Sequence, residues 1–103
     1  MTGADMPGGD APGLAFETCD WVCEKEIAAI CTDTWGIEVK PNETDEAAQP
    51  FHWVSIPALG ATHGEIFYIK ELANDGVYEF FFCAPSLNIT KGTGSPINPN
   101  AIK

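Results

Sequence analysis

Apolar residues recur at helical spacing early in the chain, with charged residues between them. The apolar positions are Cys19, Val22, Cys23, Ile27 and Ile30, and the charged ones are Glu24, Lys25 and Glu26. Thr18 can act as an N-cap and Asp20 suits the positive end of a helix. The pattern therefore predicts a helix of about ten to twelve residues from Thr18. Residues 27–31 also suit a strand, so a short strand can follow the helix.

Three further segments favour strands. Trp35, Ile37 and Val39 alternate with polar neighbours, as in a half-buried strand. Residues 61–69 form a second candidate. Residues 77–84, VYEFFFCA, are apolar on both faces apart from Glu79, which predicts a buried inner strand. Residues 41–50 are acidic and bounded by prolines, which is typical of a surface loop.

The remaining segments are a short helix and two irregular stretches. Residues 70–76, KELANDG, predict one helical turn that ends at Gly76. Residues 88–103 are rich in Gly, Pro and Asn and predict a loop, and residues 1–13 predict a mobile lead-in. At 103 residues the chain forms at most one domain. The predicted inner strand lacks partners within so few elements, so we expect residues 14–103 to be a piece of something larger.

Composition excludes several classes of function. The chain has 15 acidic and 5 basic residues, a formal net charge of −10, which disfavours nucleic acids and anionic membranes as partners. The sequence contains no run of about 18 apolar residues, so it predicts no membrane span. The N-terminal residues have neither the basic nor the apolar region of a secretory signal, so we expect a cytoplasmic protein.

The four cysteines are Cys19, Cys23, Cys31 and Cys83. In a reducing cytosol we expect them to stay free. Cys19 and Cys23 lie four residues apart, on one face of the predicted helix. Two such thiols can bind zinc, but no second pair of ligands stands at zinc-finger spacing, so we interpret both as small buried apolar residues.

One imidazole and one carboxylate are the candidate metal ligands. His52 precedes Glu65 by thirteen residues, and an apolar run broken by Pro57 and Gly60 lies between them. Histidine nitrogen and carboxylate oxygen are ligands that zinc and manganese accept. The residue types alone leave purely structural roles open for both.

Four blocks of the sequence resemble the C-terminal part of the metal-dependent cyclase family, which includes bacterial kynurenine formamidases and isatin hydrolases. The blocks are ETCDWVCEKEIAAICTDTWGIEVKPNE, FHWVSIPALGATHGEIFYIKELA, GVYEFFFCAPSLNITKGTGSP and INPNAIK, and the similarity covers roughly residues 12–103. The resemblance implies an α/β fold of the swivelling β/β/α cyclase type, here partial, with a mixed sheet and peripheral helices. It also implies an oligomer that hydrolyses small amides with zinc or manganese.

By position in these blocks, His52 and Glu65 match the family's later metal ligands. The spacing of thirteen agrees with a branch of the family that carries IPxxG after the histidine. His63 stands where relatives carry an apolar residue, so the resemblance gives it no role, and we interpret it as structural or solvent-facing. Backbone of the GTGSP loop, with Gly92 and Gly94, is a candidate for approaching the substrate, but we favour a plain turn as the role of these glycines.

The family's HxGTHxD block does not occur in this sequence, whose histidines are His52 and His63. We therefore expect no catalytic residue here, and weak metal binding by two ligands. The predicted function is that of the C-terminal segment of an amide hydrolase resembling kynurenine formamidase. We expect the chain to be inactive alone. Its expected partners are further copies of itself in a homo-oligomer or a complementing N-terminal half, and a small amide is the substrate of the complete enzyme. Two alternatives stay open: a non-catalytic interaction subunit, and a small metal-binding domain using His52, His63, Glu65 and a cysteine.

Overall fold

The computed structural model describes residues 10–103, which divide into two compact units, Met1–Tyr68 and Ile69–Lys103. The predicted lead-in falls mostly on residues 1–9, outside the described part. In the described part, the N–H of Ala11 donates to the carbonyl of Lys40 (3.3 Å), and the carbonyl of Ala11 accepts the N–H of Lys40 (2.9 Å). This antiparallel bridge joins the start of the described chain to the segment that precedes the acidic loop.

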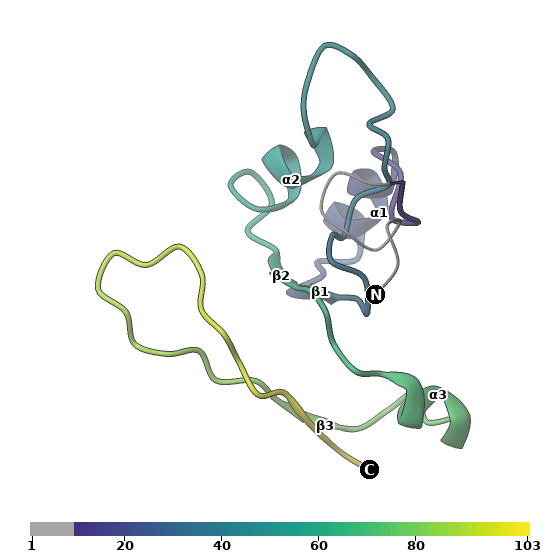
Figure 1. The fold of residues 1–103 in the computed structure, drawn as a ribbon, viewed down its shortest axis with the longest axis vertical. Helices are drawn as coiled ribbons and strands as arrows, with labels where there is room; N and C mark the ends of the chain where they lie inside the picture. The colour runs from purple at the N-terminus through teal and green to yellow at the C-terminus, as the bar shows by residue number, and fades with distance from the viewer. Residues whose placement is uncertain (1–9) are drawn as a thin grey trace. The chain divides into compact units, whose positions relative to one another are not determined.

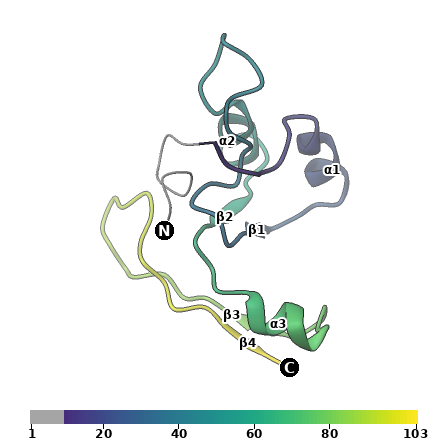
Figure 2. The same ribbon diagram turned by 45° about the vertical axis from the view of Figure 1, so that its right-hand side comes forward.

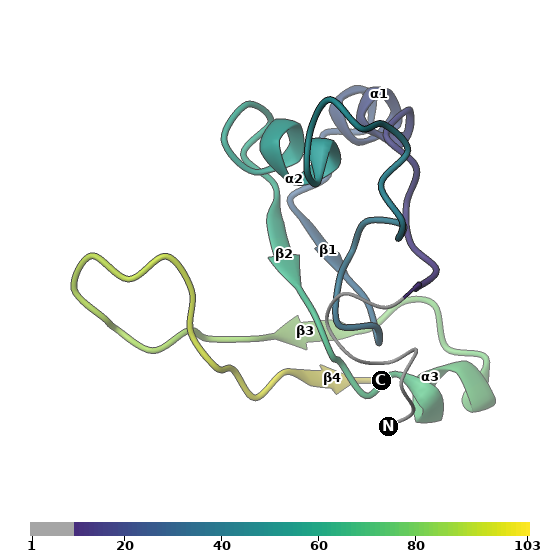
Figure 3. The same ribbon diagram turned by 45° about the horizontal axis from the view of Figure 1, so that its top comes forward.

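The first unit contains two short helices and a two-stranded parallel sheet (Figure 1). Its elements are α1 (Thr18–Glu24), β1 (Ala29–Cys31), α2 (Pro50–Ser55) and β2 (Thr62–Gly64). β1 and β2 lie side by side, with Ala29 opposite Thr62 and Cys31 opposite Gly64 (Figure 3). Parallel strands need a long crossover connection, and the connection here includes α2. The crossover therefore places α2 next to the start of β2.

The predicted first helix exists but is shorter than expected. α1 begins at Thr18, yet Glu17 occupies the N-cap position and no side chain caps the helix. It ends at Glu24, and Glu26 has a positive φ of 52°, which interrupts the helical backbone. The short strand predicted after the helix is present as β1. Cys19 is buried as predicted, whereas Cys23 is exposed, and all four cysteines are free.

The core of the first unit is small and gathers around α1 and α2. Its buried apolar residues are Cys19, Val22, Ile37, Phe51 and Ala61, and the partly buried residues packed against them are Leu14, Ile27, Ile30, Val54 and Leu59. Phe51 is completely buried, and it begins the helix that also carries His52. The packing of this core thus sets the position of α2.

The prediction of a strand over residues 35–39 is wrong. The segment forms only isolated bridges, Leu14 with Glu38 and Ala11 with Lys40. Ile37 is buried as predicted, but Glu38 is buried too, with 2% of its surface exposed. Because the backbone is irregular here, consecutive side chains do not alternate between core and solvent.

The second unit contains α3 (Lys70–Asp75) and an antiparallel pair of strands, β3 (Phe81–Cys83) and β4 (Asn100–Ile102) (Figure 2). α3 agrees with the prediction and ends at Gly76, whose φ of 64° is the left-handed conformation that glycine adopts easily. The prediction of a buried inner strand over residues 77–84 is wrong. All three residues of β3 are exposed, because a unit with one other strand and one short helix cannot cover both faces of a sheet.

No helix among residues 10–103 combines the length and the apolar character needed to cross a lipid bilayer.

Candidate metal centre

His52 and Glu65 come together because a tight connection joins α2 to β2. The N–H of Gly60 donates to the carbonyl of Ile56 (3.0 Å), and the N–H of Ala61 donates to that of Ser55 (2.9 Å). Gly60 takes a φ of 73°, which the reversal of the chain requires. As a result, His52 Nε2 lies 3.5 Å from Glu65 Oε1. The spacing of thirteen residues is bridged by half of a helix, a turn and a short strand.

The carboxylate of Glu65 is held by backbone from another part of the unit. Its Oε1 accepts the N–H of Ile37 (3.3 Å). Ile66, the next residue, has a positive φ of 60°, which is strained for a β-branched side chain, and its N–H donates to the carbonyl of Thr34 (2.9 Å). The 34–37 segment therefore fixes both the backbone and the carboxylate at this position.

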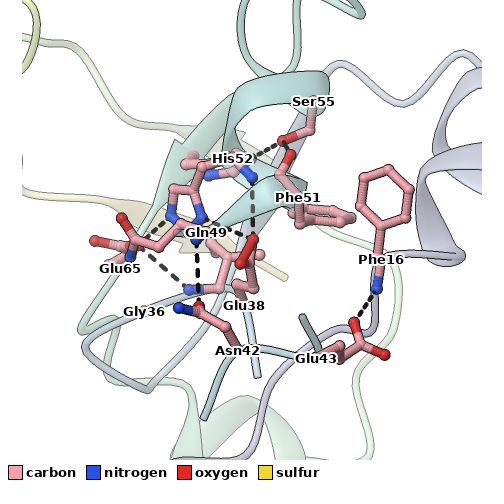
Figure 4. A network of polar contacts seen from close by, with 12 residues as sticks. Phe16, Gly36, Glu38, Asn42, Glu43, Gln49, Phe51, His52, Ser55 and Glu65 are labelled. Carbon is pink, nitrogen blue, oxygen red and sulfur yellow. Dashed lines mark hydrogen bonds and ion pairs between the residues drawn. The ribbon is translucent and has the colours of Figure 1, made fainter. Parts of the chain in front are cut away.

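A second carboxylate, Glu38, faces the other nitrogen of His52. Figure 4 shows the imidazole of His52 between Glu65 on one side and Glu38 on the other. Glu38 Oε1 lies 3.4 Å from His52 Nδ1 and accepts the backbone N–H of His52 (3.2 Å). Carboxylates therefore contact both ring nitrogens, and a proton on Nδ1 directed at Glu38 would leave the Nε2 lone pair for a cation beside Glu65. This is the arrangement of a metal-binding histidine oriented by an acid.

His63 joins the group from β2. Its Nε2 lies 2.8 Å from the hydroxyl of Ser55, which donates in turn to the carbonyl of Phe51 (2.8 Å). The rings of His52 and His63 meet edge to face, with their centres 4.9 Å apart. His63, which we interpreted as structural or solvent-facing, therefore lies beside His52 and is hydrogen-bonded to Ser55.

The residues of the site fit a divalent cation. One ligand atom from each of His52, His63 and Glu65 lies within 4.8 Å of the others. Two buried polar atoms in this cluster, Glu38 Oε2 and His63 Nδ1, have no hydrogen-bond partner among the described residues. Two imidazoles and a carboxylate are a donor set that zinc and other borderline divalent ions accept. A bound cation would compensate the buried charge of Glu38.

Burial lowers the pKa of His63, and the neighbouring His52 lowers it further. Glu65 and Glu38 oppose the shift because each attracts a proton to the ring. The net effect keeps His63 neutral to lower pH than a free histidine. A neutral imidazole is the form that binds a metal.

This shift predicts that the metal-free chain loses stability as the pH falls. The folded pKa of His63 lies below the unfolded value of 6.5, so the unfolded state takes up the proton first. The contribution of neutral His63 to the free energy of unfolding is complete above the unfolded pKa and is lost as the pH falls below that value. Urea unfolding at a series of pH values from about 7.5 to about 5.5 measures the effect. A His63→Leu variant should lose less stability over the same range, and identical slopes for the two proteins would contradict the prediction.

Comparisons with known proteins place this arrangement in context. No family model matches the chain, and no curated protein matches it. A solved structure, described as the crystal structure of a novel cyclase, matches with 36% sequence identity and a TM-score of 0.76. The fold is of the cyclase type. The match covers 88% of this chain and 30% of the cyclase, so the chain spans about a third of the length of that protein.

The mixed α/β fold predicted from the sequence is thus confirmed as one that matches a cyclase. Within this cyclase-type fold, the structure brings together His52 and Glu65, the two residues selected as ligands. Sequence reasoning gave no role to Glu38 and did not consider Ser55. His63 was a candidate ligand only in the alternative of a small metal-binding domain, and the only sequence signal for Ser55 was its proximity to His52.

The GTGSP loop belongs to the second unit of the cyclase-type fold. The N–H of Gly92 donates to the carbonyl of Ile89 (3.0 Å), which closes a turn. A Cβ at Gly92 would lie 3.0 Å from the side chain of Ile89, so close packing within the turn favours glycine there. This is the turn role that we considered for Gly92, and the role in substrate binding stays a prediction.

Proposed function

We propose that this chain supplies part of the metal centre of a metal-dependent amide hydrolase of the cyclase family, similar to kynurenine formamidase. The observation that carries the proposal is the approach of His52 Nε2 to Glu65 Oε1, 3.5 Å apart, with Glu38 holding the other nitrogen of the ring. The 36% identity to a cyclase of known structure supports it. The preferred ion is zinc or manganese, because nitrogen and carboxylate ligands suit both.

A bound divalent ion would supply Lewis acidity toward a scissile carbonyl and would lower the pKa of a bound water. The residues of this chain hold and orient that ion. His52 and Glu65 provide the ligand atoms, and Glu38 keeps the proton of His52 on Nδ1. His63 is hydrogen-bonded to Ser55. Neither histidine of the chain is then free to protonate a leaving nitrogen, so we expect no turnover by this polypeptide alone.

A shallow hollow beside His52 offers room for a small amide. It has a volume of about 400 Å³ and is lined by Gln49, His52, Trp53, Ile56 and Pro57. Apolar walls with one amide side chain and one imidazole are typical of sites for small organic molecules. His52 lies both in this lining and in the metal group, so a substrate in the hollow would lie beside the ion.

Titration calorimetry with zinc and manganese tests the proposal. We expect the wild-type chain to bind at least one of these ions in the micromolar range and His52→Ala to lose at least about 100-fold in affinity, more than the loss from removing an outer-shell partner. Trp53→Ala, the next residue on the same helix and 72% exposed, is the matched control and should bind normally. Hydrolysis of formylkynurenine should require a second polypeptide that carries the HxGTHxD histidines. Absence of binding by the wild-type chain would contradict the proposal.

The second candidate is a non-catalytic interaction subunit, which the exposed surface of the second unit favours. Tyr78 is 90% exposed, Phe81 on β3 68% and Ile102 on β4 61%. Phe81 and Ile102 are partners across the two strands, and exposed apolar side chains that are neighbours on a sheet are typical of a surface that docks onto another chain. A chain that binds no cation and still associates with another polypeptide would favour this function.

A further inference from the structure

The hydrogen bonds around Ser55 determine which nitrogen of His63 carries the proton. Ser55 Oγ donates its single proton to the carbonyl of Phe51, which can only accept. The same oxygen lies 2.8 Å from His63 Nε2, so it must accept a proton from that nitrogen. Neutral His63 therefore carries its proton on Nε2 and presents a lone pair on Nδ1.

This lone pair is buried and has no hydrogen-bond partner among the residues that the structure describes. Buried polar atoms are almost always satisfied, so an orphaned acceptor beside other ligand atoms points to a missing partner. Donor atoms from His52, His63 and Glu65 lie within 4.8 Å of one another. Ligands of a tetrahedral zinc ion lie about 3.3 Å apart. Side-chain rotations that move the ligand atoms by about 1 Å would therefore close the group around an ion.

We propose that His63 is a third ligand of the cation through Nδ1, and that Ser55 is a positioning residue that selects the required tautomer. The inference rests on the proposed metal centre and changes its composition. The site becomes a set of two histidines and one carboxylate from a single chain, instead of the pair His52 and Glu65. Such a set suits zinc or another borderline divalent ion and leaves at least one position open.

The experiment uses cobalt(II) as a spectroscopic substitute for zinc. Each imidazole bound to cobalt through one nitrogen keeps an N–H on the other, which gives a strongly shifted exchangeable proton signal in the NMR spectrum. We expect two such signals in the wild-type chain and one in His63→Leu. Calorimetry with zinc should show a loss of about 100-fold in affinity for His63→Leu and about 10-fold for Ser55→Ala, the smaller loss being typical of an outer-shell residue.

Ser95→Ala is the matched control for Ser55→Ala. Ser95 also uses its hydroxyl in a hydrogen bond to the backbone, accepting the N–H of Leu87 at 3.1 Å, but it belongs to the second unit and contacts none of the proposed ligands. We expect its cation affinity to equal that of the wild type. Circular dichroism of each metal-free variant checks that the variant is folded.

The outcomes separate this inference from the proposed function. If His63→Leu binds zinc as tightly as the wild type and keeps both shifted signals, whereas His52→Ala binds none, His63 is not a ligand and the two-ligand centre stands. If Ser55→Ala and Ser95→Ala have equal affinities, Ser55 does not act through the tautomer. If the wild-type chain binds neither zinc nor cobalt, the metal centre itself is absent and both proposals fail.

Discussion

Replacement of Phe51 by alanine is expected to abolish the cooperative unfolding transition of the first unit. Phe51 is completely buried at the start of α2, within a core of only a few buried residues. Truncation of a buried phenylalanine costs about 3–5 kcal/mol. Domains have about 0.05–0.15 kcal/mol of stability per residue, so a unit of fewer than 70 residues has only a few kcal/mol in total. Urea unfolding followed by circular dichroism measures the loss.

The matched control for Phe51→Ala lies two residues along the same helix. Trp53 is also a large aromatic residue, but it is 72% exposed, so Trp53→Ala should change the unfolding free energy by no more than about 0.5 kcal/mol. Similar transitions for Phe51→Ala and the wild type would contradict the prediction, because they would mean that the core does not depend on this ring.

The effect of Phe51→Ala should extend to the metal group. The ring of Phe51 stacks on that of His63, with 5.9 Å between their centres, and its carbonyl accepts the hydroxyl proton of Ser55. α2 therefore contributes Phe51 to the core, and His52 and Ser55 to the site. Because core and site share this helix, loss of the packing should also separate the ligands.

Local sequence patterns predicted the elements that depend on local interactions. The helix that ends at Gly76 and the short strand that follows α1 were both predicted, because a glycine C-cap and a short apolar run act within a few residues. The buried strand over residues 77–84 was not found. Its apolar composition indicates that the segment needs cover, but composition cannot indicate whether the chain itself supplies that cover.

The candidate site was predicted only in part. His52 and Glu65 were selected through the resemblance to the cyclase family, and the structure places them 3.5 Å apart. Glu38 was missed because the alternation of Trp35, Ile37 and Val39 assigned it to the solvent side of a strand that does not form. Periodicity gives the direction of a side chain only where the backbone is regular. Glu38 enters the interior from irregular backbone, which no sequence period describes.

Conversion of Glu38 to glutamine is expected to have opposite effects on the metal-free and metal-bound chain. The carboxylate is 2% exposed, and one of its oxygens has no partner among the described residues. A buried charge without a cation is destabilising, so the neutral amide should raise the unfolding free energy of the metal-free chain by about 1 kcal/mol. The same change removes the acid that orients His52, which should lower zinc affinity by about 10–100-fold.

Two measurements on one variant test this prediction: urea unfolding in the presence of a chelator, and calorimetry with zinc. Glu46→Gln provides the control, because Glu46 lies exposed in the acidic loop and its change removes the same charge far from the core. If Glu38 were only a structural acceptor for the backbone N–H of His52, glutamine would replace it without loss of zinc affinity. The opposite signs are therefore the decisive observation, because only a carboxylate placed to balance a cation is unfavourable without the ion and favourable with it.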